Sequence, residues 1–185
     1  ITTGLTLGGG NGNISAGTTI LTANTTVFTG FISGTSLTVV SVTSGTISVG
    51  LVLGNSSATP GTTIVGSTTA VFTGTISGTT LTISGMTSGI IYAGMKLTGG
   101  SIPSGIFIVS NISGAGINST WSVNTSVTLS STVLTGTRYN VDIGQTTGSS
   151  SNIVTFNAVN YTVSVSQTIT TANMFAYGLG TAAVT

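Results

Sequence analysis

The stretch VFTGTISGTTLT, at residues 71–82, holds the pattern that decides the fold of this chain. Towards its end, Leu81 and Ile83 would face one side of an extended chain, and the threonine between them would face the other. Alternation with a period of two indicates a half-buried β-strand. The abundant Thr, Val and Ile also favour strands, because β-branched side chains pack well on a pleated sheet and lose rotamer freedom in a helix. Similar alternation at residues 121–129 and 161–166 predicts further strands.

The chain repeats itself around this stretch. A nearly identical sequence, VFTGFISGTSLT, begins 44 residues earlier, at Val27, and the similarity continues from residues 43–53 into residues 87–97. The N-terminal residues resemble residues 47–64, so the chain enters the pattern in the middle of a repeat. The expected segments are a partial copy (1–26), a copy (27–70), a longer copy (71–136) and a C-terminal β segment with an apolar tail (137–185). All of them can equally fold as one domain.

The fold class expected from these patterns is all-β, and two architectures are consistent with it. In the first, duplicated halves form one antiparallel β-sandwich of the jelly-roll or Ig-like kind. In the second, stacked β-repeats each bury an apolar face against the next repeat. Because the chain begins within a repeat, a strand from a neighbouring subunit could also complete the sheet, as in donor-strand assembly.

Charged side chains are almost absent. Apart from tyrosines, the only ionisable side chains are those of Lys96, Arg138 and Asp142, and the sequence has no His, Cys or Glu. Charged residues make up 2% of the chain, against about a quarter of an average soluble domain. The polar surface must therefore consist of Thr, Ser, Asn and Gly, which hydrate well but do not repel other molecules. Such a surface suits a protein that is glycosylated or packed against neighbouring copies.

This composition argues against catalysis and against metal binding. General acid–base catalysis needs a histidine or paired carboxylates, and a nucleophilic serine or threonine needs a neighbouring base. Lys96 is the only candidate base, and its place between Met95 and Leu97 favours a solubilising residue on one face of a strand. Transition metals prefer His or Cys, and a single carboxylate makes a weak calcium site. We therefore expect no enzyme, no catalytic, cofactor-binding or metal-binding residue, and no cofactor.

Asn-x-Ser/Thr sequons are the one motif present in excess. They occur at Asn13, Asn24, Asn55, Asn111, Asn118, Asn124 and Asn160. A chain this rich in Ser and Thr produces sequons by chance, so each motif alone is weak. In the functional interpretation, some of them carry glycans, which would supply the solubility that charge does not. These asparagines are therefore the only candidate site residues, as candidate N-glycosylation sites.

Several segments look familiar: FTGTISGTTLTI (72–83), GMKL (94–97), WSVNTSVTL (121–129) and YTVSVSQTI (161–169). They resemble the Gly/Thr-rich β-repeats of tail-fibre, tail and capsid-decoration proteins of phages and large aquatic viruses. The resemblance covers most of residues 1–136 and part of the C-terminal region. It implies a virion-surface or appendage role, self-association, and contact with receptors, glycans or other virion or cell-surface proteins. It implies neither a cofactor nor catalytic residues.

The function expected is therefore that of a non-enzymatic structural subunit in an extracellular or virion-surface assembly, such as a fibre, a tail or a decoration protein. Such a subunit would associate with copies of itself through β-strands. One alternative is a glycosylated, pilin-like subunit of a secreted cellular filament that uses donor-strand exchange. Another is an ice-binding or adhesive protein. We expect no nucleic-acid partner, because a net charge of +1 offers no phosphate-binding patch, and no membrane span, because no apolar run approaches about 20 residues.

Overall fold

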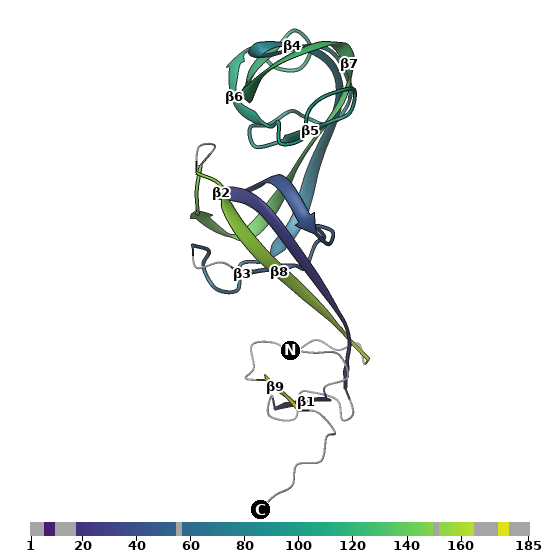
Figure 1. The fold of residues 1–185 in the computed structure, drawn as a ribbon, viewed down its shortest axis with the longest axis vertical. Coiled ribbons are helices and arrows are strands. Elements are labelled where there is room, and N and C mark those ends of the chain that lie inside the picture. The colour runs from purple at the N-terminus through teal and green to yellow at the C-terminus, as the bar shows by residue number, and fades with distance from the viewer. Residues whose placement is uncertain (1–5, 10–17, 55–56, 150–151, 165–173, 178–185) are drawn as a thin grey trace, which may run out of the picture. The chain divides into compact units, whose positions relative to one another are not determined.

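The structure, a computed structural model, describes residues 6–9, 18–54, 57–149, 152–164 and 174–177. These residues contain strands and their connections, and no helix. The strands in chain order are β1 (Thr6–Gly9), β2 (Ile20–Ser44), β3 (Val52–Gly54), β4 (Ile64–Ser88), β5 (Lys96–Thr98), β6 (Ile108–Ser113), β7 (Thr120–Thr146), β8 (Val154–Val163) and β9 (Met174–Tyr177) (Figure 1). The all-β class expected from the alternating pattern is confirmed.

The strands form two sheets. β1 pairs with β9 in a two-stranded antiparallel sheet. The other strands form a seven-stranded antiparallel sheet with the order β3-β8-β2-β7-β4, in which β5 and β6 also pair with β7. The chain divides into two compact units: unit 1 comprises residues 1–25 and 159–185, and unit 2 comprises residues 26–158. β7 runs without a break through Gly136, where the sequence suggested a change of segment.

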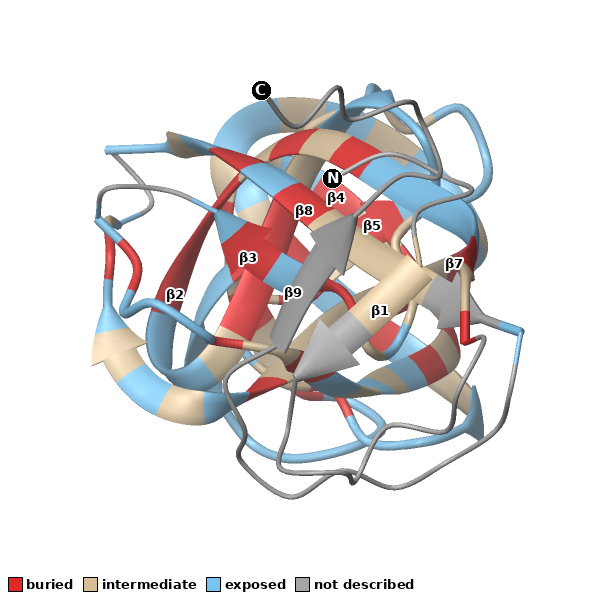
Figure 2. Ribbon diagram, turned by 90° about the horizontal axis from the view of Figure 1, so that it is seen from below, coloured by how far each residue is buried: buried red, intermediate tan, exposed pale blue. Residues whose placement is uncertain are grey.

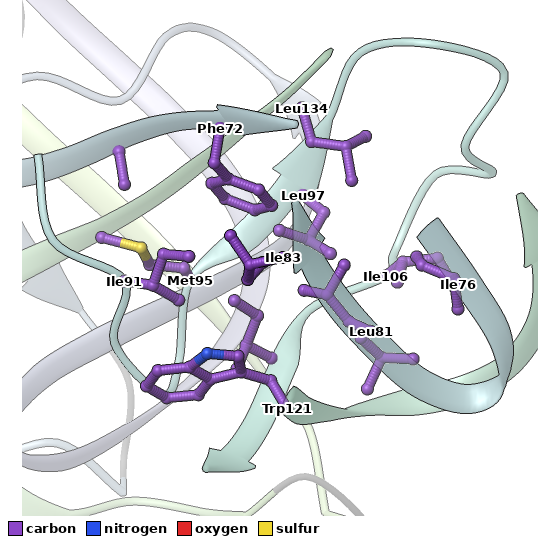
Figure 3. Close-up of a cluster of buried hydrophobic side chains, with 13 residues drawn as sticks. Phe72, Ile76, Leu81, Ile83, Ile91, Met95, Leu97, Ile106, Trp121 and Leu134 are labelled. Carbon is purple, nitrogen blue, oxygen red and sulfur yellow. The ribbon is translucent and has the colours of Figure 1, made fainter. Parts of the chain in front are cut away.

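Unit 2 contains two hydrophobic cores, one for each complete repeat. The Phe28 core consists of the buried residues Phe28, Ile32, Leu37, Val39, Leu51, Leu53, Ala58, Ile64, Val141, Phe156 and Ala158. The Phe72 core consists of Ala70, Phe72, Ile76, Leu81, Ile83, Ile91, Met95, Leu97, Ile106, Ile108, Trp121, Val123 and Leu134 (Figure 3). Residues 44 positions apart play the same part, as Leu37 and Leu81 do. We call the parts of unit 2 around these cores the first half and the second half.

Each core forms because alternate residues of curved strands point to a common interior. Figure 2 shows the resulting bands of buried and exposed residues along the strands. Phe28 and Phe72 are fully buried, at 0% exposure. The ring of Phe28 stacks on that of Phe156, with ring centroids 5.2 Å apart. Such a pair adds about 0.5–1.5 kcal/mol to the stabilisation that burial provides.

The long strands β2 and β4 bend sharply around the cores. Gly74 lies so close to a later part of β4 that a Cβ atom there would stand 2.8 Å from the carbonyl oxygen of Thr82, and β2 has the same close approach at the equivalent place. Gly34 and Gly78, with φ of 62° and 63°, lie where the register with β7 shifts. A glycine with positive φ at such a shift forms a β-bulge, which bends the strand and increases its twist. One continuous strand can therefore wrap around a core.

The backbone repeats as closely as the side chains do. Glycines with positive φ recur 44 residues apart, as Gly34 and Gly78 (62° and 63°), Gly45 and Gly89 (75° and 74°), Gly50 and Gly94 (89° and 82°), and Gly61 and Gly105 (both 87°). L-residues with a side chain rarely adopt such angles. The glycine spacing thus gives the two repeats the same turns.

The two halves of unit 2 are joined by a shared ladder and by direct side-chain contact. β4 pairs with β7 from Ile64 to Thr82, so one antiparallel ladder runs through both halves (Figure 1). The ring of Phe31, from the first half, meets the ring of Phe107, from the second half, at a centroid distance of 5.6 Å and an interplanar angle of 62°. The halves are therefore coupled parts of one unit.

Candidate interaction site

One hydrogen-bond arrangement occurs three times, once in each copy of the repeat. It starts from equivalent antiparallel bridges, which are Thr6↔Thr19, Val52↔Thr63 and Lys96↔Phe107. The second residue of each bridge donates its backbone N–H to a side-chain oxygen from later in the chain, and its carbonyl oxygen accepts the backbone N–H of that later residue. The pairs are Thr19 with Ser164, Thr63 with Asp142, and Phe107 with Asn124. The side-chain bonds measure 2.9, 2.8 and 2.9 Å, and the backbone bonds 2.9, 3.1 and 3.1 Å.

We call this arrangement the return clamp, because a later segment of the chain returns to each copy and holds it. The three clamps are nested. The first copy is clamped by the last of the three later residues, Ser164, the second by Asp142, and the third by the nearest, Asn124. The three copies thus follow one another along the chain, and the segments that close them follow in the reverse order. The first and second copies are each completed by a return segment that is not adjacent to them in the sequence, whereas the third is completed by the segment that comes next.

The three return segments share a short sequence pattern, which the analysis of the sequence missed. They read WSVN (121–124), YNVD (139–142) and YTVS (161–164), an aromatic residue, any residue, valine, and a residue with a side-chain acceptor. Alternation predicts strands at the first and the third, whereas the second falls in the segment expected after the repeats, at 137–185, with no strand predicted there. Val123 and Val141 are both buried in the cores. The pattern was thus a signal that could have predicted three closing segments.

An open groove lies in the second half of unit 2, beside the aromatic residue of the first return segment. We call it the Trp121 groove, and its volume is about 700 Å³. It is lined by Met86, Gly89, Ile90, Ile91, Tyr92, Asn111, Gly114, Ala115, Gly116 and Trp121. Figure 3 shows Trp121 at the margin of the Phe72 core, near Ile91 and Met95. Its indole N–H donates to the hydroxyl of Ser119 at 2.9 Å, so the polar edge of the ring is already satisfied.

The groove is suited to apolar contact rather than to chemistry. Among the described residues that line it, none is charged. Ile90 is 63% exposed, which is a large solvent exposure for an isoleucine. The side-chain amide of Asn111 donates to the carbonyl oxygen of Gly114 at 3.0 Å. The groove can therefore hold an apolar side chain or strand edge, but offers no acid, base or nucleophile pair.

The three charged residues each have different surroundings. The Arg138 guanidinium stacks on the ring of Tyr92, 4.2 Å from its centroid, and donates to the carbonyl oxygen of Ala93 at 3.4 Å. Asp142 serves in the return clamp. Lys96 lies on a strand, β5, where it is half-buried and lines a small groove with Tyr139. Burial raises the pKa of the Tyr139 phenol above its usual value, which favours the neutral form of this ring.

The sequon asparagines are scattered rather than gathered into one site. Asn13 and Asn55 lie outside the described residues. Asn24, Asn111 and Asn118 are exposed, and Asn160 is half-buried. Asn124 is poorly placed for a glycan, because its Nδ2 donates to the carbonyl oxygen of Gly105 at 3.0 Å while its Oδ1 serves in the clamp.

Neither a metal-binding cluster nor a membrane-spanning helix is found among the described residues. The part of the chain that the structure describes holds no group of three or more His, Cys, Asp or Glu side chains able to bind a metal ion. Within the same residues, there is no helix with the length and apolar character needed to cross a membrane.

We found no protein-family model, no curated protein and no solved structure that matches this chain.

Proposed function

We propose that this chain is a non-enzymatic structural subunit of an extracellular or virion-surface assembly, such as a fibre, a tail or a decoration protein, and that it associates with copies of itself. In this role, β-modules of one design are stacked to build length and to present their ends to neighbours. The return clamp carries the proposal.

The return clamp supports a spacer made of repeated modules. The same bridge and the same two hydrogen bonds recur with three different side chains, those of Ser164, Asp142 and Asn124. What the three copies share is therefore the geometry of a module, not the chemistry of one group. A repeated unit whose neighbours supply part of its interior is the construction principle of extended structural proteins.

The surface chemistry supports a role outside the cytoplasm in contact with neighbours. With a single carboxylate, no histidine and no cysteine, the sequence has neither the histidine nor the carboxylate pair that general acid–base catalysis most often uses, nor a cysteine nucleophile. Its exposed residues are largely Thr, Ser, Asn and Gly, which do not keep copies apart by charge. A charge-poor surface also keeps the same character over a wide pH range, as an exposed appendage requires.

Immunogold electron microscopy tests this function. Antibodies raised against residues 26–158 should label virions, their appendages or extracellular filaments from the source of the protein. Antibodies pre-absorbed with the purified chain serve as the control and should give no label. Label confined to the cell interior, with particles and filaments unlabelled, would show that the proposal is wrong.

A further inference from the structure

The Trp121 groove has a counterpart in the first half of unit 2. Shifting by 44 residues relates Met86 to Val42 and Ile91 to Ile47, and the return segments relate Trp121 to Tyr139. Val42, Ile47 and Tyr139 line one groove, which we call the Tyr139 groove. The structure therefore holds the same surface twice, in two different surroundings.

The Tyr139 groove is covered by the following repeat. Its other wall consists of Lys96 and Thr98 on β5, and of Thr137 on β7, all from the second half of unit 2. With this cover, the groove has a volume of about 230 Å³, against about 700 Å³ for the Trp121 groove. Both edges of β5 are paired, one with β7 and the other with residues 106–107. The face of a β5-type strand, here the one that carries Lys96 and Thr98, is thus the natural occupant of such a groove. Among the described residues, the Trp121 groove has no such strand over it.

The uncovered groove is also the more apolar of the two. Thr46 and Ser48 in the first half are replaced by Ile90 and Tyr92 in the second half, and the aromatic ring is enlarged from tyrosine to tryptophan. End repeats that face only water need a polar outer surface. An apolar surface at this end, with Ile90 63% exposed, instead indicates that a partner covers it.

We propose that the Trp121 groove receives the face of β1 that carries Thr6, from a second copy of this chain. This inference rests on the proposed function and names the self-association surface. β1 is the equivalent of β5 in unit 1: the bridge Thr6↔Thr19 repeats Lys96↔Phe107. The bond from the Leu7 N–H to the Thr18 carbonyl, 2.8 Å, likewise repeats the bond from Leu97 to Ile106, also 2.8 Å.

Electrostatics favours this contact over a random one. Thr6 stands where β5 carries Lys96, so no charge has to lose its water when this face of β1 covers the apolar groove. The contact joins two different surfaces, a groove and a strand face, and every copy carries one of each. Such a heterologous contact continues head to tail, into an open chain of subunits or into a closed ring.

Cysteine cross-linking of the full chain tests the contact, because the sequence has no cysteine of its own. Thr6→Cys and Met86→Cys single variants are mixed and treated with a short bis-maleimide reagent. We expect one cross-linked dimer from the mixture, little from either variant alone, and a ladder of oligomers from the T6C/M86C double variant. Dimers formed by M86C alone would show groove-to-groove pairing and would overturn the proposal.

A matched pair of substitutions tests the groove itself in the T6C/M86C background. Ile90→Lys should weaken the ladder at least about tenfold, because a lysine would have to be desolvated in an apolar contact. Val65→Lys, at a residue of similar exposure (53%) that does not line the groove, should leave the ladder unchanged. Folding of both is checked by circular dichroism.

Two results separate this inference from the proposed function. A folded chain that remains uncross-linked at every concentration overturns the β1 contact, including the case in which a glycan or an unrelated protein occupies the groove instead. If immunogold labelling still marks virions or filaments, the structural role stands without this contact.

Discussion

Asn124, Asp142 and Ser164 show how little a residue needs in order to close a repeat. Each supplies one side-chain oxygen at 2.8–2.9 Å from a backbone N–H that the strand ladder leaves without a backbone partner. A hydrogen bond of this kind contributes about 0.5–1.5 kcal/mol, and leaving a buried donor unpaired costs about 1–3 kcal/mol. The clamp is therefore tolerant of residue type but not of losing the acceptor, which explains why an amide, a carboxylate and a hydroxyl all occur.

The clamp residues should differ in cost according to their burial. Asn124→Ala removes the partner of the N–H of Phe107, which is fully buried, and of the Gly105 carbonyl. We expect a loss of about 1–3 kcal/mol in the free energy of unfolding. Asp142→Ala should cost less, about 0.5–1.5 kcal/mol, because water can reach the exposed N–H of Thr63. Urea unfolding measures both values.

Asp142→Asn is the control for charge, because an asparagine keeps the acceptor oxygen and reproduces the residue of the second-half clamp. It should retain most of the stability that D142A loses. Equal losses in D142N and D142A would mean that the negative charge, and not the hydrogen bond, holds this strand.

At the scale of elements, the decisive feature is the curvature of β2 and β4. A straight strand of 25 residues could not enclose a core, since its inward side chains would spread along its whole length. Bulges at Gly34 and Gly78, and the close approach at Gly74, bring distant parts of one strand together. The glycines in the repeat are thus part of the fold and not only turn punctuation.

Two alanine substitutions in β4 separate the effect of close approach from that of glycine as such. Gly74→Ala should lower the free energy of unfolding by about 1–3 kcal/mol, because its Cβ would stand 2.8 Å from the Thr82 oxygen. Gly66→Ala should change it by less than about 0.5 kcal/mol, because the nearest atom to that Cβ is 3.7 Å away. Thermal unfolding compares the two. A harmless G74A would mean that β4 does not bend as described.

For unit 2 as a whole, the question is whether two cores behave as one. Each half has its own interior, yet β4 and β7 pass through both, and Phe31 contacts Phe107 across the junction. Repeats coupled in this way unfold together when the interface term outweighs the instability of a single repeat. The shared ladder leads us to expect a single transition.

The only tryptophan of the chain makes this expectation measurable. Trp121 belongs to the Phe72 core, so its fluorescence reports the second half, whereas circular dichroism reports all strands. Phe28→Ala, in the first half, should cost about 3–5 kcal/mol and shift the urea midpoint of both signals equally. Phe72→Ala is the matched change in the second half and should do the same. If F28A leaves the urea midpoint of the Trp121 fluorescence unchanged, the halves unfold independently.

The sequence by itself determined the strands, the repeat and the chemistry that is missing. Alternation such as that at Leu81 and Ile83 was enough to predict the strands, because half-burial imposes a period of two on any strand. The 44-residue spacing was enough for the second, since the same buried positions and the same positive-φ glycines must recur if the same module is built. The sequence pattern did not predict the Trp121 groove, because whether a groove is open depends on which distant strands lie over it.

Only the tertiary structure decided which return segment closes which copy. The segments at Trp121, Tyr139 and Tyr161 are locally alike, so each would fit any of the three copies. The contacts that choose between them are long-range, as between Thr19 and Ser164, 145 residues apart, and local pattern carries no information about them. Connectivity selects the nested order: Asn124 follows the third copy at once and closes it with the shortest loop, which costs the least entropy. That order is also what covers the Tyr139 groove and leaves the Trp121 groove open.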